Sequence, residues 1–184
     1  MKLIPEWYEH QYCLIAWPCN KDLYGKIINK ARDEVANVIN EIAKTEHVIV
    51  FSNKEDINEI QNKTDHKNID IVECKLDDSW MRDIAPIFYN EDEKLKSISF
   101  EFNGYGKYPD YLNDNKISKF ISNYLNIPTK ISDLVIEGGA ITYDDKKNLF
   151  STKNVIFNKN RKQKYNSEYL SLIHISEPTR PVMI

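Results

Sequence analysis

The densest group of polar side chains lies in segment 77–83, which reads DDSWMRD. It lies between two apolar segments, where a loop can present side chains to a ligand. A guanidinium offers N–H donors in a fixed fork that a carboxylate can accept bidentately, and an indole face attracts a cation. Two acids flanking Trp80 therefore indicate a site for a planar cation. The alternative is a solvated acidic loop in which Arg82 pairs with Asp78 or Asp83.

A second group is Glu137-Gly138-Gly139, which leads into an apolar segment beginning at Ala140. Paired glycines after an acid indicate a close backbone approach or an unusual φ/ψ, and the alternative is an ordinary tight turn. Gly104 and Gly106 on either side of a tyrosine have the same two interpretations, a turn or the wall of a site.

The elements that position these residues alternate between strands and helices, which indicates an α/β fold. An apolar stripe at Ile27, Ala31, Val35, Val38 and Ile42 predicts a helix over about 22–44. Ser52 and Glu55 have capping-box spacing and predict a short helix near 54–62. We expect strands at 12–17, 47–51, 69–76 and around 98–102, and a further helix that starts at Asn113 or Asp114 and carries Ile117, Phe120, Ile121, Tyr124 and Leu125.

The chain also contains an internal repeat at an offset of about 54 positions. The matched pairs are Asp83 with Glu137, Ile87 with Ile141, Tyr89 with Tyr143, Leu95 with Leu149 and Ser97 with Ser151. Between them lie turn-forming segments at 90–94 and 144–148, so the repeat predicts two hairpins that each follow a carboxylate. Chance similarity of two hairpins is one explanation, and a ring of repeated β/α units, as in a propeller, is the other.

Composition limits the classes of function. The 184 residues are 41% hydrophobic and 29% charged, which is typical of a globular protein. Lys plus Arg number 25 and Asp plus Glu number 28, so the net charge of −3 argues against nucleic acid as the main partner. We find no apolar run of membrane-spanning length and no apolar stretch of a signal peptide near Pro5–His10, and we expect a cytoplasmic protein.

Cys13, Cys19 and Cys74 lack metal-ligand spacing and are expected to be reduced structural thiols, without a metal site.

The C-terminal segment has a different character. Residues 170–180 read LSLIHISEPTR, which resembles the translation of a sequencing-library adapter along its whole length. We therefore expect residues 170–184 to be a non-native tail, and we draw no site from His174. The alternative is an ordinary short C-terminal segment.

Taken together, the motifs resemble the agmatine deiminase family, the bacterial peptidylarginine-deiminase-like branch of the guanidine-modifying enzymes. The matching stretches occur in family order: PEW at 5–7, AWP at 16–18, DDSWMRD at 77–83, FNGYGKYP at 102–109, IEGGAI at 136–141 and FNKNR at 157–161. They cover nearly all of residues 5–165.

This resemblance implies an α/β-propeller (pentein) fold of repeated β/α modules around a central active site. It implies that Asp83 grips the substrate guanidinium, that Trp80 lines the same pocket and that Glu137 orients a catalytic histidine. It also implies hydrolysis of agmatine to N-carbamoylputrescine and ammonia, a step of putrescine and polyamine synthesis. No metal or organic cofactor is expected, and a homo-oligomer is compatible with the family.

The sequence departs from the family after Glu137. No His-x-Asp pair follows it, and no cysteine follows Cys74. His10, His47 and His66 all precede the family's histidine position. We therefore expect residues 1–169 to be the N-terminal part of a single deiminase domain whose C-terminal modules are missing, and the chain as given to be catalytically inactive. The alternatives are a non-catalytic guanidinium-binding fragment and a peptidyl-arginine or arginine deiminase of the same fold.

Overall fold

The computed structural model describes residues 2–65, 67–144 and 148–161. His66, His174 and the expected tail at 170–184 lie outside the described residues. The chain divides into two compact units. The parallel-sheet unit comprises residues 9–81 and 112–114, and the mixed-sheet unit comprises the described parts of 1–8, 82–111 and 115–184.

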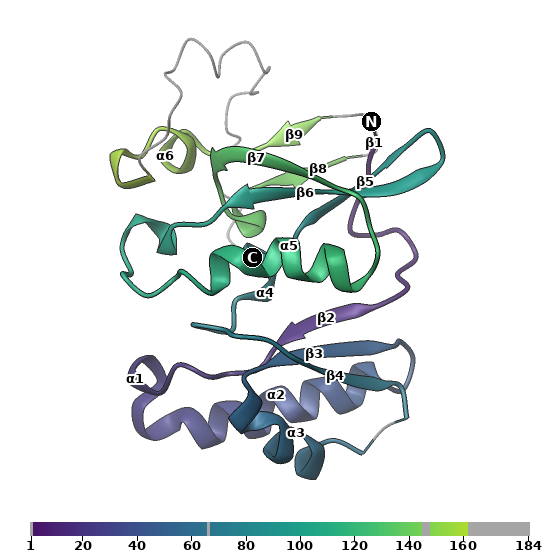
Figure 1. Ribbon diagram of the computed structural model, residues 1–184, viewed down its shortest axis with the longest axis vertical. Coiled ribbons are helices and arrows are strands. Elements are labelled where there is room, and N and C mark those ends of the chain that lie inside the picture. The colour runs from purple at the N-terminus through teal and green to yellow at the C-terminus, as the bar shows by residue number, and fades with distance from the viewer. Residues whose placement is uncertain (1, 66, 145–147, 162–184) are drawn as a thin grey trace. The chain divides into compact units, whose positions relative to one another are not determined.

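Strands and helices alternate along much of the chain, as the sequence predicts, and two hairpins of consecutive strands interrupt the alternation (Figure 1). The described strands are β1 (Lys2–Leu3), β2 (Cys13–Ala16), β3 (Val48–Ser52), β4 (Ile69–Glu73), β5 (Ile87–Glu91), β6 (Lys94–Glu101), β7 (Thr129–Val135), β8 (Thr142–Tyr143) and β9 (Leu149–Phe150). The α-helices are α1 (Lys21–Tyr24), α2 (Ile28–Ile42), α3 (Ile57–Lys63), α4 (Met81–Ile84), α5 (Asp114–Tyr124) and α6 (Lys153–Ile156). Short 3₁₀ turns are η1 (Gly25–Ile27), η2 (Lys54–Asp56), η3 (Gly104–Gly106), η4 (Gly138–Ala140) and η5 (Lys159–Arg161).

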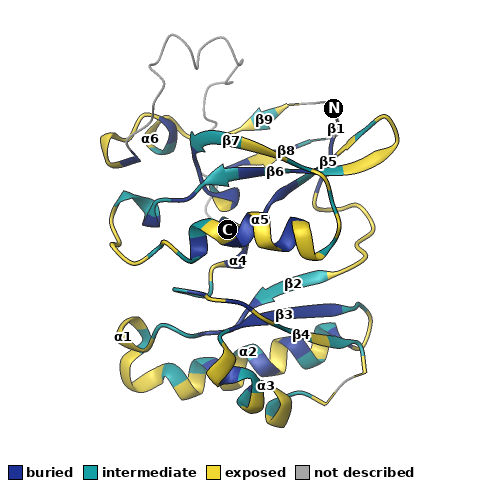
Figure 2. Cartoon of the chain, viewed as in Figure 1, coloured by how far each residue is buried: buried dark blue, intermediate teal, exposed yellow. Residues whose placement is uncertain are grey.

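The parallel-sheet unit is built on the strand order β2-β3-β4. The central strand β3 is buried along its whole length, because neighbouring strands flank it and its sequence VIVFS is almost entirely apolar. Helices α2 and α3 connect successive strands and lie on the same face of the sheet (Figures 1 and 2). Trp17, Ile39 and Ile60 are fully buried in the resulting core.

The helix expected over about 22–44 is interrupted near its start. Gly25 has a φ of +52° and ends α1, and η1 follows before α2 begins. The expected apolar stripe is only partly correct, because Ile27 is 62% exposed and Val38 is 53% exposed. The buried positions of α2 are Arg32, Ala36 and Ile39.

Arg32 explains the difference in the buried face of α2. Its side chain is 7% exposed and bonds to Asp56 Oδ1 at 2.7 Å, to Glu59 Oε2 at 2.5 Å and to the carbonyl oxygen of Pro18 at 2.9 Å. A buried guanidinium is stable only with such partners, which a hydrophobic pattern does not reveal.

The predicted capping box at Ser52 is wrong. Ser52 is the last residue of β3 and is fully buried, and its hydroxyl has no hydrogen-bond partner among the described residues. The short helix nevertheless forms, as η2 followed by α3. Asn53, at the start of this segment, uses its side chain to accept the backbone N–H of Leu76 at 2.9 Å and so connects η2 to the segment after β4.

The mixed-sheet unit has the strand order β1-β5-β6-β7. The first pairs are antiparallel, and the β6–β7 pair is parallel, with α5 as the crossover that such a pair needs. The β5–β6 hairpin turns at Asp92 and Glu93, whose φ values of +52° and +60° fit a two-residue turn of the primed type. Ser97 of β6 bonds to Ser122 of α5 at 2.9 Å, which fixes the helix against one face of the sheet.

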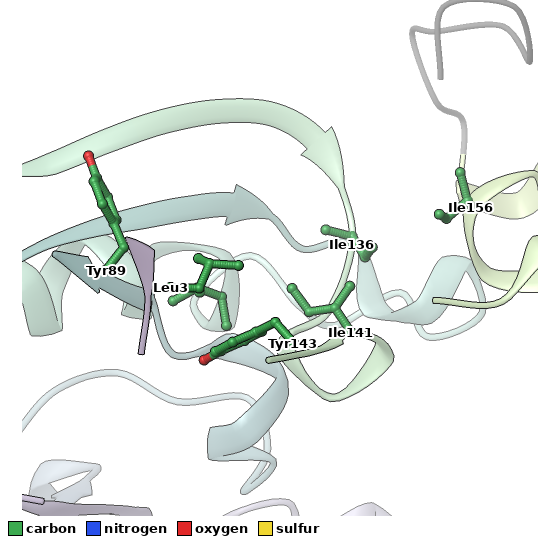
Figure 3. Packing of buried hydrophobic residues seen from close by; sticks show 7 residues of the cluster. Leu3, Tyr89, Ile136, Ile141, Tyr143 and Ile156 are labelled. Atoms are coloured by element: carbon green, nitrogen blue, oxygen red, sulfur yellow. The ribbon is translucent and has the colours of Figure 1, made fainter. Parts of the chain in front are cut away.

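The core of the mixed-sheet unit joins the two halves of the sequence repeat. Ile87, Tyr89, Ile141 and Tyr143 all belong to one buried cluster, together with Leu3, Ile136 and Ile156 (Figure 3). The second expected hairpin forms as β8 paired with β9, although its turn at 145–147 lies outside the described residues. The predicted pair of hairpins, each following a carboxylate, is therefore confirmed.

In the part of the chain that the structure describes, none of the helices has the length and apolar character needed to cross a membrane.

Candidate functional site

A carboxylate with both oxygens held by the protein lies at Asp83 in α4. Its Oδ1 accepts the backbone N–H of Gly139 at 3.0 Å, and its Oδ2 accepts the phenol O–H of Tyr105 at 2.7 Å. The three residues come from α4, η4 and η3 of the mixed-sheet unit. Asp83 is half-buried. An ionised carboxylate has about four lone-pair sites, so each oxygen keeps capacity for a further donor.

Tyr105 reaches Asp83 from a tightly wound loop. Gly104, Tyr105 and Gly106 have φ values of +62°, +60° and +66°, so three consecutive residues are left-handed. This conformation is ordinary for glycine but costs about 1–3 kcal/mol for a tyrosine, and such strain persists only where the surroundings enforce it. Asn103 holds the loop in this conformation through two hydrogen bonds. Its side chain accepts the N–H of Gly106 at 2.9 Å and donates to the carbonyl oxygen of Arg161 at 3.1 Å.

A buried ion pair lies beside this loop. Arg161 Nη1 contacts Glu137 Oε1, and the two residues are 8% and 2% exposed. The guanidinium carbon of Arg161 is 5.9 Å from the centroid of the Tyr105 ring. Burial lowers the pKa of Arg161, while Tyr105 and Asp83 oppose that change. A buried carboxylate is costly without a cation, so Arg161 compensates Glu137, and its own Nε has no hydrogen-bond partner among the described residues.

Gly138 and Gly139 leave no room for side chains. A Cβ atom at Gly138 would lie 2.3 Å from the carbonyl oxygen of Arg82, and one at Gly139 would lie 2.2 Å from Asp83 Oδ1. Both interpretations of this segment are therefore correct, because η4 is a tight turn and the backbone also approaches its neighbours closely. The consequence is that Glu137 and the Asp83 carboxylate are held within one compact cluster of the mixed-sheet unit.

Trp80 belongs to the parallel-sheet unit, whereas Asp83 and Glu137 belong to the mixed-sheet unit. Trp80 is 53% exposed, and its indole N–H donates to Asp78 Oδ2 at 3.0 Å. Burial raises the pKa of Asp78. The alternative in which Arg82 pairs with Asp78 or Asp83 is wrong, because Arg82 pairs with Glu6.

Asp77 and Asp114 stabilise the start of the DDSWMRD segment through hydrogen bonds. Asp77 accepts the backbone N–H and the side-chain amide of Asn113, both at 2.7 Å, and Asp114 Oδ1 accepts the backbone N–H of Asp77 at 2.8 Å. Asp114 is 3% exposed. Burial raises the pKa of Asp114 to about 7, and the nearby carboxylates of Asp77 and Asp78 add to this effect. These contacts assign Asp77 and Asp114 to the architecture of the loop.

The three cysteines have the electrostatics of structural thiols. Burial raises the pKa of Cys19 and of Cys74 to about 12, with a further contribution from Asp114 in both cases. Burial, followed by the charge of Glu46, raises the pKa of Cys13. A thiol acts as a nucleophile through its thiolate, which such surroundings disfavour.

The described histidines, His10 and His47, belong to the parallel-sheet unit, whereas Asp83 belongs to the mixed-sheet unit. His47 bonds to Asp70 at 2.8 Å and His10 lies 3.6 Å from Glu46, all within the parallel-sheet unit. Within residues 2–65, 67–144 and 148–161, no group of histidine, cysteine and acidic side chains has the arrangement of a metal site.

Sequence reasoning missed two members of the cluster. Tyr105 was visible only as the residue between the two glycines of the FNGYGKYP stretch, and Arg161 only as the end of the FNKNR stretch. Their contacts with Asp83 and Glu137 join residues that are 22 and 24 positions apart, and both contacts arise from loops without a periodic pattern. A tyrosine flanked by glycines was the available signal for the first, and a basic residue among asparagines was the weaker signal for the second.

Comparisons with known proteins agree with the motifs. The model of the Porphyromonas-type peptidyl-arginine deiminase family matches residues 2–172. A relative from Mycoplasma capricolum subsp. capricolum, named "Putative agmatine deiminase", is 32% identical over 90% of this chain and 47% of its own length. The chain thus spans about half the length of the curated relatives it matches.

Solved structures show the same fold. The agmatine deiminase of Enterococcus faecalis, described as catalysing its reaction, has a TM-score of 0.87 at 17% identity, covering 96% of this chain and 51% of that chain. The C. jejuni agmatine deiminase with substrate bound has a TM-score of 0.83 at 22% identity, covering 96% of this chain and 54% of that one. At these identities the likeness establishes the α/β fold that the sequence predicts.

Proposed function

Because the chain belongs to the Porphyromonas-type peptidyl-arginine deiminase family, we propose that it is the N-terminal portion of an agmatine deiminase. The reaction proposed for the intact protein is hydrolysis of the agmatine guanidinium to N-carbamoylputrescine and ammonia, a step toward putrescine. Relatives that carry the agmatine deiminase name support this assignment over the other guanidine-modifying activities.

The observation that carries the proposal is the pre-oriented carboxylate of Asp83. Tyr105 and the Gly139 N–H hold its two oxygens at 2.7 and 3.0 Å, and each oxygen keeps a lone-pair site. A guanidinium presents two parallel N–H donors that match two oxygens of one carboxylate. Holding the planar cation in one orientation lowers the barrier to attack on its central carbon.

The remaining roles are proposed from the family motifs. Trp80 supplies an aromatic face for the cation, and Glu137, compensated by Arg161, orients the catalytic histidine. In the intact protein a cysteine thiolate would attack the guanidinium carbon, and the C–N bond to ammonia would break as the histidine gives it a proton. Water, activated by the same histidine, would then release the ureido product and restore the thiolate.

We propose that the 184-residue chain is inactive by itself. Its three cysteines have raised thiol pKa values, and all three precede Glu137 in the sequence. In this proposal residues 1–169 are part of one propeller domain whose ring is completed by further modules, and residues 170–184 are not native to it. Sequencing the source locus past the codon for Tyr169 tests this: a frame that continues to a His-x-Asp pair and a late cysteine supports it, and genuine DNA that encodes 170–184 and stops contradicts it.

The activity is tested by ammonia release from agmatine by the full-length gene product. Asp83→Ala should lower kcat/KM by at least about 100-fold, because the substrate guanidinium would lose two hydrogen bonds to a charged acceptor, each worth about 1.5–3 kcal/mol. Asp110→Ala, which removes an exposed carboxylate, is the matched control and should retain full activity. Unchanged turnover in Asp83→Ala would remove Asp83 from the site.

Parallel assays with arginine and a blocked arginine amide separate agmatine from the arginine and peptidyl-arginine alternatives. Faster turnover of either compound would keep the reaction type and change the substrate. A full-length product that binds agmatine in calorimetry without releasing ammonia would favour the non-catalytic alternative.

A further inference from the structure

We infer that Tyr105 is a positioning residue that holds the Asp83 carboxylate in the orientation that receives the substrate guanidinium. The inference rests on the proposed function, because it assigns Tyr105 a task in the same site. The sequence marks this tyrosine only through the glycines on either side of it and the FNGYGKYP stretch at 102–109, and neither assigns it a role.

Each oxygen of the Asp83 carboxylate accepts one hydrogen bond from the protein. Tyr105 donates to Oδ2 at 2.7 Å and Gly139 donates to Oδ1 at 3.0 Å, so the carboxylate is gripped by one donor on each oxygen. Rotation about the Cβ–Cγ bond of Asp83 would break both bonds together. The carboxylate plane is therefore set before a ligand arrives, and one lone-pair site on each oxygen is left for a bidentate partner.

The loop that carries Tyr105 is tightly packed and has an unusual backbone conformation. The left-handed run Gly104–Gly106 leaves the tyrosine in a conformation that a non-glycine residue rarely adopts. Gly106 is packed so closely that a Cβ atom there would lie 2.4 Å from the carbonyl oxygen of Asn160. Strained backbone that is held this firmly is typical of residues whose direction matters for function.

The ring of Tyr105 packs against three neighbouring side chains. Phe102 and Tyr108 meet it edge to face, with ring centroids 5.1 and 6.1 Å away, and Arg161 lies over its face at 5.9 Å. These contacts hold the ring independently of its hydroxyl group. Removing the hydroxyl alone therefore separates the hydrogen bond to Asp83 from the packing of the loop.

The test compares Tyr105→Phe with the unsubstituted full-length protein, with Tyr108→Phe as the control. Tyr108 is in the same loop and is 44% exposed, so its variant loses a hydroxyl group without touching Asp83. We expect Tyr105→Phe to lower kcat/KM for agmatine by about 10- to 100-fold, mainly through KM, because a hydrogen bond to a charged acceptor is lost. Tyr108→Phe should change neither kcat/KM nor KM.

The outcomes separate the two proposals. Ammonia release by the unsubstituted protein with an unchanged KM in Tyr105→Phe overturns the role of Tyr105 and leaves the proposed function standing. A fall in activity that tracks a lower melting temperature and leaves KM unchanged also overturns it. No ammonia release by the unsubstituted protein refutes the proposed function, and the inference is then refuted with it.

Discussion

Replacing Asp114 with asparagine should stabilise the parallel-sheet unit at neutral pH. Asp114 is 3% exposed, and its burial raises its pKa from 3.8 to about 7. The carboxyl of Asp114 therefore binds a proton more tightly in the folded state than in the unfolded state. The stability that this group contributes is fully present below pH 3.8 and is lost as the pH rises through about 7. Asparagine resembles the protonated form at every pH, and its Oδ1 can still accept the Asp77 N–H.

The magnitude follows from the two pKa values. A full change from 3.8 to about 7 corresponds to about 4 kcal/mol, since each tenfold change in proton affinity is worth about 1.36 kcal/mol. We expect Asp114→Asn to be more stable than the unsubstituted chain by about 2–4 kcal/mol at pH 8 and by about 1–1.5 kcal/mol at pH 5. The dependence on pH identifies the cause, because a change in packing would act equally at both values.

Urea unfolding followed by tryptophan fluorescence measures this difference. Trp17 is 0% exposed and lies in the core of the same unit, so its emission reports the unfolding of that unit. Asp110→Asn, at an exposed position, is the control and should be neutral at both pH values. An Asp114→Asn stabilisation that is the same at pH 5 and pH 8, or a loss of stability at pH 8, would refute the reasoning.

Two other predictions concern backbone and thiols. Gly106→Ala should lower the free energy of unfolding by about 2–4 kcal/mol, because the new Cβ would lie 2.4 Å from the Asn160 oxygen at a φ of +66°. Gly25→Ala is the control, because Gly25 has a φ of +52° and a Cβ atom there would meet no atom within 4 Å, so the free energy of unfolding should fall by only about 1 kcal/mol. Equal losses of unfolding free energy in urea for the two variants would exclude the close approach at Gly106 as the cause. Cys19 and Cys74 should react with iodoacetamide at pH 8 at least about 100-fold more slowly in the folded chain than in urea, since pKa values of about 12 leave little thiolate. Equal labelling rates would contradict these pKa values.

Much of the fold could be predicted from patterns of apolar residues. The run at Val48–Phe51 became the buried central strand β3, and the repeat placed Tyr89 and Tyr143 in one core cluster. Both signals are local or periodic patterns of apolar residues, and such residues become buried when the chain folds. The buried face of α2 could not be predicted in this way. Arg32 is buried there because acids of the following helical segment pair with it, and hydrophobicity alone excludes arginine from a core.

The candidate site likewise contains residues that the sequence predicted and contacts that it could not predict. Asp83 was predicted as a site residue because acids beside a tryptophan suit a planar cation and because its stretch resembles a family motif. Glu137 was predicted as a site residue from the family resemblance alone, and both roles stay predictions. The Tyr105 contact with Asp83 depends on a left-handed tyrosine, a conformation that residue type argues against. The Arg161 contact with Glu137 depends on a non-local approach of two loops. Both contacts are tertiary, so neither could be predicted from spacing.

The pairing of β1 with β5 has a consequence for the order in which the chain can fold. Leu3 of β1 is paired with Tyr89 of β5, so β1 cannot form its strand pair until the ribosome has synthesised β5. The strands of the parallel sheet, from Cys13 to Glu73, are complete before that partner exists. Closing a long loop costs more entropy than closing the short ones within that sheet, and domains form largely in the order of synthesis. We therefore expect the segment from Cys13 to Glu73 to be structured first during translation, and the β1–β5 pair of the mixed sheet to form afterwards.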